Sequence, residues 1–253
     1  MKGTPPIANI ILGMAGSGKT MMMKYLTSNY SLANINTYNI NLDPAVHTVD
    51  YPLSIDIRDC VKYKSIMKEF QLGPNGAIVT SLNLFAAQFD EVINLISKKP
   101  AVQRISIDTP GQIEVFSWSA SGQVITDSLS CSFPTIITFI IDSERCLNPN
   151  TFMSNMLYAL SIMYKSRLPM VVVFNKIDLC DYSILVSWMK DYKCFQKALE
   201  KDQTYRADLS NSMCLVLDEF YKVLNVCGIS ALKGTGMKEY EDCVQIAIKE
   251  YNE

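Results

Sequence analysis

Residues 7–20, IANIILGMAGSGKT, constrain the fold more than any other part of the sequence. A short apolar run leads directly into Gly-x-x-x-x-Gly-Lys-Thr, the pattern of a loop that binds a phosphate between a strand and a helix. Glycines let backbone N–H groups curl around the phosphate, and the helix presents the positive end of its dipole to it. The pattern therefore predicts an α/β fold with a phosphate site after its first strand.

Each position of this loop has a predicted part in holding a nucleoside triphosphate. Lys19 is predicted to reach the β- and γ-phosphates, and Thr20 to offer its hydroxyl to Mg²⁺. The loop backbone is predicted to surround the phosphates through Gly13, Ala15, Gly16, Ser17 and Gly18. Met14 stands where many dimeric nucleotide switches carry a second lysine that reaches the partner's nucleotide, so another group must complete the site.

Apolar, β-branched runs recur along the chain and predict a mostly parallel sheet with helices on both faces, the architecture of P-loop NTPases. The predicted strands are residues 7–12, 38–42, 104–108, 135–142, 170–175 and 224–230. Between the second and third of these, residues 80–97 have the periodicity of one helix, whose apolar face runs from Phe85 and Phe89 to Ile96.

The tetrapeptide NKID ends an apolar strand and predicts which base is bound. The carboxylate of Asp178 can accept hydrogen bonds from N1–H and the exocyclic amine of guanine, a pair of donors that adenine lacks. Asn175 and Lys176 would brace the loop and the base plane. Ser230 and Ala231 follow the last predicted strand and would bring their backbone to the base. These patterns favour GTP and GDP as the bound nucleotides.

The segment IDTPGQIE, which ends another predicted strand, adds a metal ligand and a γ-phosphate sensor. Asp108 is placed to hold Mg²⁺, and the N–H of Gly111 to lie near the γ-phosphate. Three residues are candidates to orient the attacking water: Asp43, Gln112 and Glu114. The sequence leaves open which of them does so, and Arg58 is the nearest candidate for an arginine that neutralises the developing charge.

The chain is predicted to form one GTP-binding domain over residues 1–253, since no linker, repeat or low-complexity segment interrupts it. Residues 181–222 have the pattern of two helices that break near 202–205, and we interpret them as an insertion between the last two strands. Residues 151–164 carry three methionines on a predicted helix, which we interpret as a core helix.

The overall charge and the cysteine pattern limit the function classes. A net charge of −2 and a pI near 5.6 give no general attraction to nucleic acid or to an anionic membrane. No apolar run approaches the roughly 18 residues of a membrane span. The eight cysteines are scattered and His47 is the only histidine, so we expect reduced thiols, no zinc site and a cytoplasmic location, with shuttling to the nucleus left open.

Residues 71–80, QLGPNGAIVT, contain Gly-Pro-Asn-Gly, for which we predict a rigid turn. With GMAGSGKT, NLDPAV, IDIRD, DTPGQIE, TFMSNMLYA, LPMVVVFNKID and GISALKGTG, this stretch resembles the GPN-loop GTPases. The resemblance runs from about residue 7 to residue 251, and the Gly-Pro-Asn signature is specific to that family in this context.

The resemblance implies a constitutive dimer, either a homodimer or a heterodimer with a paralogous GPN-loop GTPase. In such a dimer Gly73, Pro74 and Asn75 would enter the partner's nucleotide site, where Asn75 would contact the γ-phosphate or the attacking water. Physical chemistry is compatible with this, because Pro74 lowers the entropy lost when the segment is ordered across an interface.

The resemblance also implies a cellular role that composition and spacing do not show. It implies assembly and nuclear import of RNA polymerase II, with polymerase subunits or assembly factors as partners and the GTP state gating client release. Eukaryotic relatives usually continue into a long acidic tail, whereas this sequence ends at IKEYNE.

Three other functions compete with a slowly hydrolysing GTPase. A P-loop small-molecule kinase would share GMAGSGKT, but NKID and DTPGQ argue against it. A GTP-dependent metallochaperone has a similar core, but its clustered cysteine and histidine ligands are not found in the sequence. A GTP-stabilised scaffold with little turnover cannot be separated from a slow enzyme by sequence alone.

Overall fold

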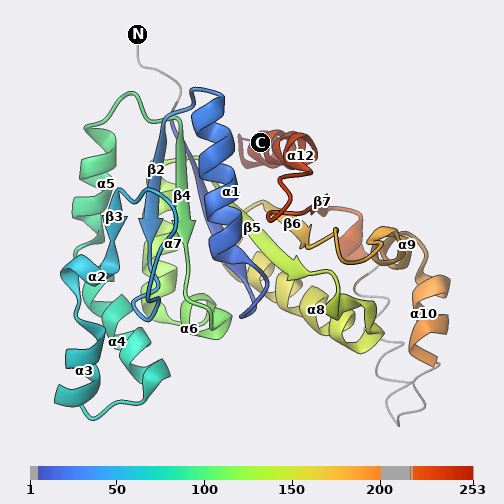
Figure 1. The fold of residues 1–253 in the computed structure, drawn as a ribbon, viewed down its shortest axis with the longest axis horizontal. Helices are drawn as coiled ribbons and strands as arrows, with labels where there is room; N and C mark the ends of the chain where they lie inside the picture. The colour runs from blue at the N-terminus through green and yellow to red at the C-terminus, as the bar shows by residue number, and fades with distance from the viewer. Residues whose placement is uncertain (1–4, 201–216, 218, 253) are drawn as a thin grey trace.

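The computed structural model describes residues 5–200, 217 and 219–252 (Figure 1). Within these residues seven parallel strands form one sheet, in the order β3-β2-β4-β1-β5-β6-β7. The strands are β1 (Ile7–Gly13), β2 (Thr37–Asn41), β3 (Ile55–Asp56), β4 (Arg104–Asp108), β5 (Thr135–Asp142), β6 (Met170–Asn175) and β7 (Asn225–Ile229). The predicted strands are thus found within one residue of their expected limits, while the two-residue β3 was not predicted.

Helices cover both faces of the sheet, as the apolar strands require. They are α1 (Lys19–Leu32), α2 (Ile57–Cys60), α3 (Tyr63–Glu69), α4 (Pro74–Ala86), α5 (Phe89–Ser97), α6 (Ile113–Ser117), α7 (Ala120–Ser132), η1 (Arg145–Leu147), α8 (Pro149–Ser166), α9 (Ser183–Lys190), α10 (Tyr192–Glu200) and α12 (Met237–Asn252). Figure 1 shows α1 in front of the sheet and α7 and α8 behind it.

Side chains of the central strand alternate between two buried apolar cores. Ile10 and Leu12 of β1 belong to the core under α4, α5, α7 and α8, whereas Ile11 belongs to the core under α1 and α12. This alternation is the period of a strand, and it explains why β1 is apolar along its whole length. The predicted α/β architecture with helices on both faces is confirmed.

The single helix predicted over residues 80–97 is wrong in its limits. The structure has two helices, α4 and α5, separated at Ala87 and Gln88. Phe85 lies in the last turn of α4 and Phe89 begins α5, and their rings meet edge to face with centroids 6.0 Å apart. The predicted apolar face is buried because both helices turn it toward the same core.

The rigid turn predicted at Gly-Pro-Asn-Gly is the start of helix α4. Gly73 is the N-cap in an extended conformation (φ −69°, ψ 171°), and Pro74 occupies the first helical position. Proline is favoured there because its fixed φ suits a helix and its missing N–H would have no intrahelical acceptor.

The region predicted as a helical insertion begins with α9 and α10, which separate at Asp191. The break that we predicted near residues 202–205 lies outside the described residues. The ring of Phe152 on α8 packs edge to face against Trp188 and Phe195, at centroid distances of 5.3 Å each. This aromatic contact fixes the described part of the region against the main core. Met156 of α8 is fully buried, as expected of a core helix.

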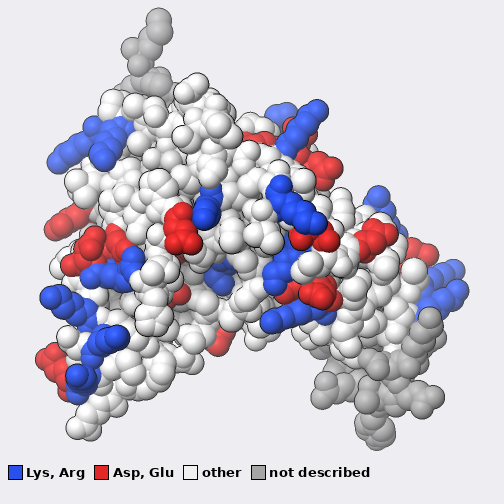
Figure 2. Space-filling view, viewed as in Figure 1, with Lys and Arg blue, Asp and Glu red and all other residues white. Residues whose placement is uncertain are grey.

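The surface has no area of one charge sign on the face shown in Figure 2, where basic and acidic side chains alternate. None of the helices in the described part of the chain combines the length and the apolar character needed to cross a bilayer. Within the described residues, no group of three or more histidine, cysteine, aspartate or glutamate side chains gathers in one place.

Candidate nucleotide site

The phosphate loop lies between the central strand β1 and helix α1, where the motif predicts it. Gly16 and Gly18 have positive φ values of 80° and 98°, which only glycine adopts without strain. Gly18 also has no room for a side chain, because a Cβ there would lie 2.3 Å from the amide nitrogen of Asn175. The Oγ of buried Ser17 has no hydrogen-bond partner within the described residues.

The side chain of Lys19 folds back onto the backbone of the phosphate loop. Its Nζ donates to the carbonyl oxygens of Gly13 at 2.8 Å and Met14 at 3.3 Å. Burial lowers the pKa of Lys19, and the carboxylates of Asp108 and Asp43 partly offset this. The ammonium group is thus held by weak backbone acceptors that a charged phosphate can replace.

Asp108 and Thr20 form a half-satisfied polar pair that fits a magnesium ion. One carboxylate oxygen, Oδ2, accepts hydrogen bonds from the hydroxyls of Thr20 at 3.2 Å and Tyr51 at 3.1 Å. The other, Oδ1, is buried without a partner within the described residues. Burial raises the pKa of Asp108 to about 6, against the opposing charge of Lys19. A hard cation beside this oxygen would remove the cost of burying it.

Asn175, at the end of β6, joins three segments of the site. Its Nδ2 donates to the carbonyl of Ser17 at 2.9 Å, and its Oδ1 accepts from the backbone N–H of Lys176 at 2.9 Å and of Ala231 at 3.2 Å. The side chain is only 3% exposed. It therefore ties the base loop to the phosphate loop and to the segment after β7, the bracing role that the sequence predicts.

The remaining residues of the base loop are also arranged around this point. Lys176 has a positive φ of 67° and its Nζ donates to Asp142 at 2.6 Å. Asp178 accepts a hydrogen bond from the hydroxyl of Ser230, which lowers the pKa of this carboxyl group. Asp178, Ser230 and Ala231 thus lie together as the guanine hypothesis requires, with Asp178 ionised as an acceptor at neutral pH.

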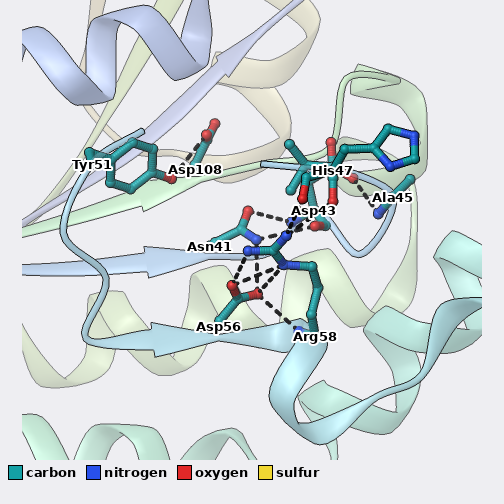
Figure 3. A network of polar contacts seen from close by, with 9 residues as sticks. Asn41, Asp43, Ala45, His47, Tyr51, Asp56, Arg58 and Asp108 are labelled. Carbon is teal, nitrogen blue, oxygen red and sulfur yellow. Dashed lines mark hydrogen bonds and ion pairs between the residues drawn. The ribbon is translucent and has the colours of Figure 1, made fainter. Parts of the chain in front are cut away.

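Among the three candidates for orienting water, Asp43 has the most defined geometry (Figure 3). Its backbone N–H donates to Oδ1 of Asn41 at 3.0 Å, and its own Oδ1 accepts from the N–H of Ala45 at 2.9 Å. The negative charge of Asp43 raises the pKa of both Lys19 and Asp108. The exposed His47 turns its ring away from the group in Figure 3.

Arg58, which the sequence analysis names as the nearest candidate arginine, forms its contacts with Asp56 and with backbone carbonyls instead. Its guanidinium makes a two-pronged ion pair with Asp56 and donates to the carbonyls of Val46 at 3.2 Å and His47 at 3.1 Å. Burial opposes ionisation of Asp56, but the hydrogen bonds from Arg58 outweigh it and lower the pKa of that carboxyl. Arg58 fastens the loop after β2 and does not present a free guanidinium (Figure 3).

Of the predicted site residues that follow β4, Gly111 and Gln112 differ from Glu114 in their burial. Gly111 and Gln112 are half-buried, and Oε1 of Gln112 is buried without a partner within the described residues. Glu114, in the first turn of α6, is exposed. Gln112 therefore has an unsatisfied acceptor for a bound water, whereas the side chain of Glu114 stands in solvent.

Gly73, Pro74 and Asn75 are exposed and lie apart from the phosphate loop of their own chain. The connection from α3 to α4 extends beyond the ends of the strands at the lower edge of Figure 1. Within residues 5–200 no hydrogen bond joins Asn75 to the phosphate loop. The segment is thus available to another molecule.

Two residues at the site were not predicted from the sequence. Tyr51, in the loop between β2 and β3, donates to Asp108, and burial raises the pKa of its hydroxyl so that it stays protonated. Asp142 ends β5 and receives Lys176. A polar residue at the end of an apolar strand was a usable signal for Asp142, whereas no local pattern marks Tyr51.

Comparison with known proteins places this site in a family. A protein-family model described as a conserved hypothetical ATP-binding protein matches residues 11–250. GPN-loop GTPase 1 of Dictyostelium discoideum is 51% identical over 248 residues, covering 98% of this chain and 63% of that protein. GPN-loop GTPase 1 of Saccharomyces cerevisiae is 51% identical over 255 residues, covering 96% of this chain and 66% of that protein. The chain thus spans somewhat less than two thirds of these two relatives.

An archaeal relative matches over its whole length. A GPN-loop GTPase of Pyrococcus abyssi is 30% identical over 250 residues, covering 96% of both chains. A crystal structure of a GTPase from Pyrococcus abyssi in the apo form has a TM-score of 0.83 and 27% identity, covering 97% of this chain and 98% of that one. Given these matches over nearly all of the sequence and the fold, the chain belongs to the GPN-loop GTPase family.

Proposed function

We propose that this chain binds GTP with Mg²⁺ and hydrolyses it slowly to GDP and phosphate. The observation that carries the proposal is the position of Asn175, which joins a guanine-type base loop directly to a phosphate loop. The family model's description mentions ATP. The carboxylate of Asp178 instead favours guanine, because adenine would leave this acceptor without its donors.

In this proposal the chain's own residues position the triphosphate and the water. Lys19 exchanges its two carbonyl acceptors for the β- and γ-phosphates, and the loop N–H groups hold the β-phosphate. Asp43 and Gln112 are the proposed groups that orient a water toward the γ-phosphate. Asp108 and Thr20 would hold Mg²⁺, which neutralises phosphate charge when bound.

Slow hydrolysis is expected because the orienting groups are not brought together in one chain. Asp43 already accepts a hydrogen bond from Ala45, and Glu114 is exposed. Intrinsic rates of GTPases that act without an activating partner are about 10⁻⁴ to 10⁻² s⁻¹. A rate far below this range in the full assembly would favour the alternative, a GTP-stabilised scaffold.

We further propose that two chains share their sites, with Asn75 of one completing the other. Its amide has both a donor and an acceptor for a γ-phosphate oxygen and a water. The exposed position of Asn75 at the start of a helix supports this, since the helix N-terminus favours an anion. The partner is a second copy or a paralogous GPN-loop GTPase.

Mixing two inactive variants tests the shared site. We expect Asn75→Ala and Lys19→Ala each to lose most turnover, and an equal mixture to recover about one quarter of wild-type activity. Half of randomly paired dimers are mixed, and each has one complete site. Asn83→Ala, an exposed asparagine on the same helix α4, is the control and should be unchanged. A mixture no more active than its components would contradict sharing between chains.

At the cellular level we propose a role in assembly and nuclear import of RNA polymerase II, with cytoplasmic residence and passage into the nucleus. Membership of the family supports this proposal. The test is binding of purified polymerase subunits to the chain loaded with a GTP analogue or with GDP. Equal binding in both states, or none, would exclude gating by the nucleotide.

A further inference from the structure

Arg145 lies against the phosphate loop, although the sequence gives it no motif. It begins η1, three residues after the end of β5, the strand next to β1 in the sheet. A Cβ placed on Gly16 would lie 3.5 Å from Nη2 and 3.7 Å from Nη1 of this arginine. The guanidinium therefore stands over the fourth residue of the loop whose N–H groups are proposed to hold the β-phosphate.

The backbone that carries Arg145 is fixed, whereas its side chain is not. The adjacent Cys146 is fully buried and accepts a hydrogen bond from Asn155 at 3.4 Å. Ser143 donates through both its hydroxyl (2.7 Å) and its N–H (3.0 Å) to the carbonyl of Asn175. The side chain of Arg145 itself is 66% exposed. It can change rotamer without moving the loop.

The contacts of Arg145 with its charged neighbours use only Nε of the guanidinium. Asp142 is its only ion-pair partner within the described residues, through Nε at 3.5 Å. The same carboxylate takes the shorter contact from Lys176, at 2.6 Å. One carboxylate thus serves two cations, and neither Nη1 nor Nη2 has a hydrogen bond within the described residues. A forked donor of this kind suits a phosphate.

Space for that contact is present on the same side of the loop. A cavity of about 310 Å³ is lined by Arg145 together with Met14, Ala15 and Ser17 of the phosphate loop and by the first turns of α8. Arg145 therefore borders an open volume at the rim of the phosphate loop. The same rim lacks a second lysine, since Met14 occupies that position.

We propose that Arg145 is an arginine finger supplied in cis: its guanidinium turns from Asp142 onto the triphosphate and stabilises the leaving GDP. This rests on the proposed GTPase function. Water attacks the γ-phosphorus, and the bond from γ-phosphorus to the β–γ bridging oxygen breaks. Its electron pair goes to that oxygen of GDP, where Arg145 neutralises it. One water proton stays on hydrogen phosphate and the other passes to solvent.

Single-turnover hydrolysis of pre-bound GTP by the full chain in its native oligomer tests this role. We expect Arg145→Gln to slow the chemical step about 10- to 100-fold, with GDP affinity within about threefold of wild type. Arg145→Lys keeps a charge without the fork and should recover part of the rate. Lys249→Ala removes one exposed charge from the far end of α12 and is the control for net charge.

The outcomes separate this inference from the proposed function. A rate for Arg145→Gln within twofold of wild type would overturn the finger while leaving the GTPase proposal intact. Equal losses of GDP affinity and rate, with no recovery in Arg145→Lys, would make Arg145 a structural brace of the loop and also overturn it. If wild type neither binds nor hydrolyses GTP, the proposed function fails before Arg145 is tested.

Discussion

Asn175→Ala is the perturbation that most directly tests how the site is held together. The substitution removes one donor and one acceptor that together make three hydrogen bonds, to Ser17, Lys176 and Ala231. It leaves the fold of β6 unchanged, because alanine can occupy the last position of a strand. Its effect therefore reports on the connection between the phosphate loop and the base loop.

The expected loss follows from the groups left without partners. Ser17 and Ala231 are 2% and 7% exposed, so water cannot replace the lost bonds easily. A buried polar group without a partner costs about 1–3 kcal/mol. Two such groups give about 2–6 kcal/mol, and some relaxation is expected, so we predict a loss of about 3 kcal/mol in the free energy of unfolding.

Urea denaturation of the nucleotide-free protein measures this loss, because bound nucleotide would add its own stabilisation. Asn94→Ala is the matched control, since Asn94 is exposed on α5 and alanine favours a helix. The control should change the free energy of unfolding by no more than about 0.5 kcal/mol. A loss below about 1 kcal/mol in Asn175→Ala, at an unchanged denaturant slope, would refute the bracing role.

Two further predictions concern the core and the base. Phe89→Ala should lower the free energy of unfolding by about 3–5 kcal/mol, since the ring is 1% exposed and packs on Phe85; equilibrium denaturation with a loss under about 1 kcal/mol would contradict it. Asp178→Asn should weaken GDP binding by about 100-fold and strengthen binding of xanthosine diphosphate, whose C2 carbonyl can accept from the new amide. Calorimetric titration with both nucleotides measures this, and an unchanged preference would remove Asp178 from base recognition.

The long strands could be predicted because their physical signal is local. β5 is buried at all eight positions and β6 at all six, so every residue of these strands had to be compatible with a core. β3 gave no such signal, because Ile55 and Asp56 form a strand only through pairing with Ile40 and Asn41 of β2. A strand of only two residues is too short to show an alternation of apolar and polar side chains.

The break between α4 and α5 was missed because the apolar period continues across it. Phe85 and Phe89 are four residues apart, as on one helix, and both are buried. The second helix does have a start signal, since Asp90 and Glu91 lie in its first turn, where acidic side chains favour the helix dipole. The apolar faces of α4 and α5 pack on the same core, so the spacing of apolar residues continues although the first helix ends.

Parts of the site that depend on one loop were predictable, and parts that depend on distant segments were not. Lys19 and the loop glycines are specified by eight consecutive residues. The contact of Tyr51 with Asp108 joins residues 57 positions apart, and no local pattern records it. Arg58 was misjudged for a different reason: its partner Asp56 is only two residues away, but the sequence does not show that the two side chains pair with each other.

The parallel sheet explains why these distant residues meet. Carboxyl ends of β1, β4, β5 and β6 lie along one edge, so the phosphate loop, Asp108, Asp142 and Asn175 come together there without any sequence signal linking them. Asn175 contacts the phosphate loop with its side chain and the segment of Arg145 with its carbonyl, through Ser143. A base bound at Asp178 would therefore order the same hydrogen-bonded unit that positions the phosphates. The residues that recognise the base and the segment that places the guanidinium of Arg145 beside Gly16 therefore belong to one structural unit.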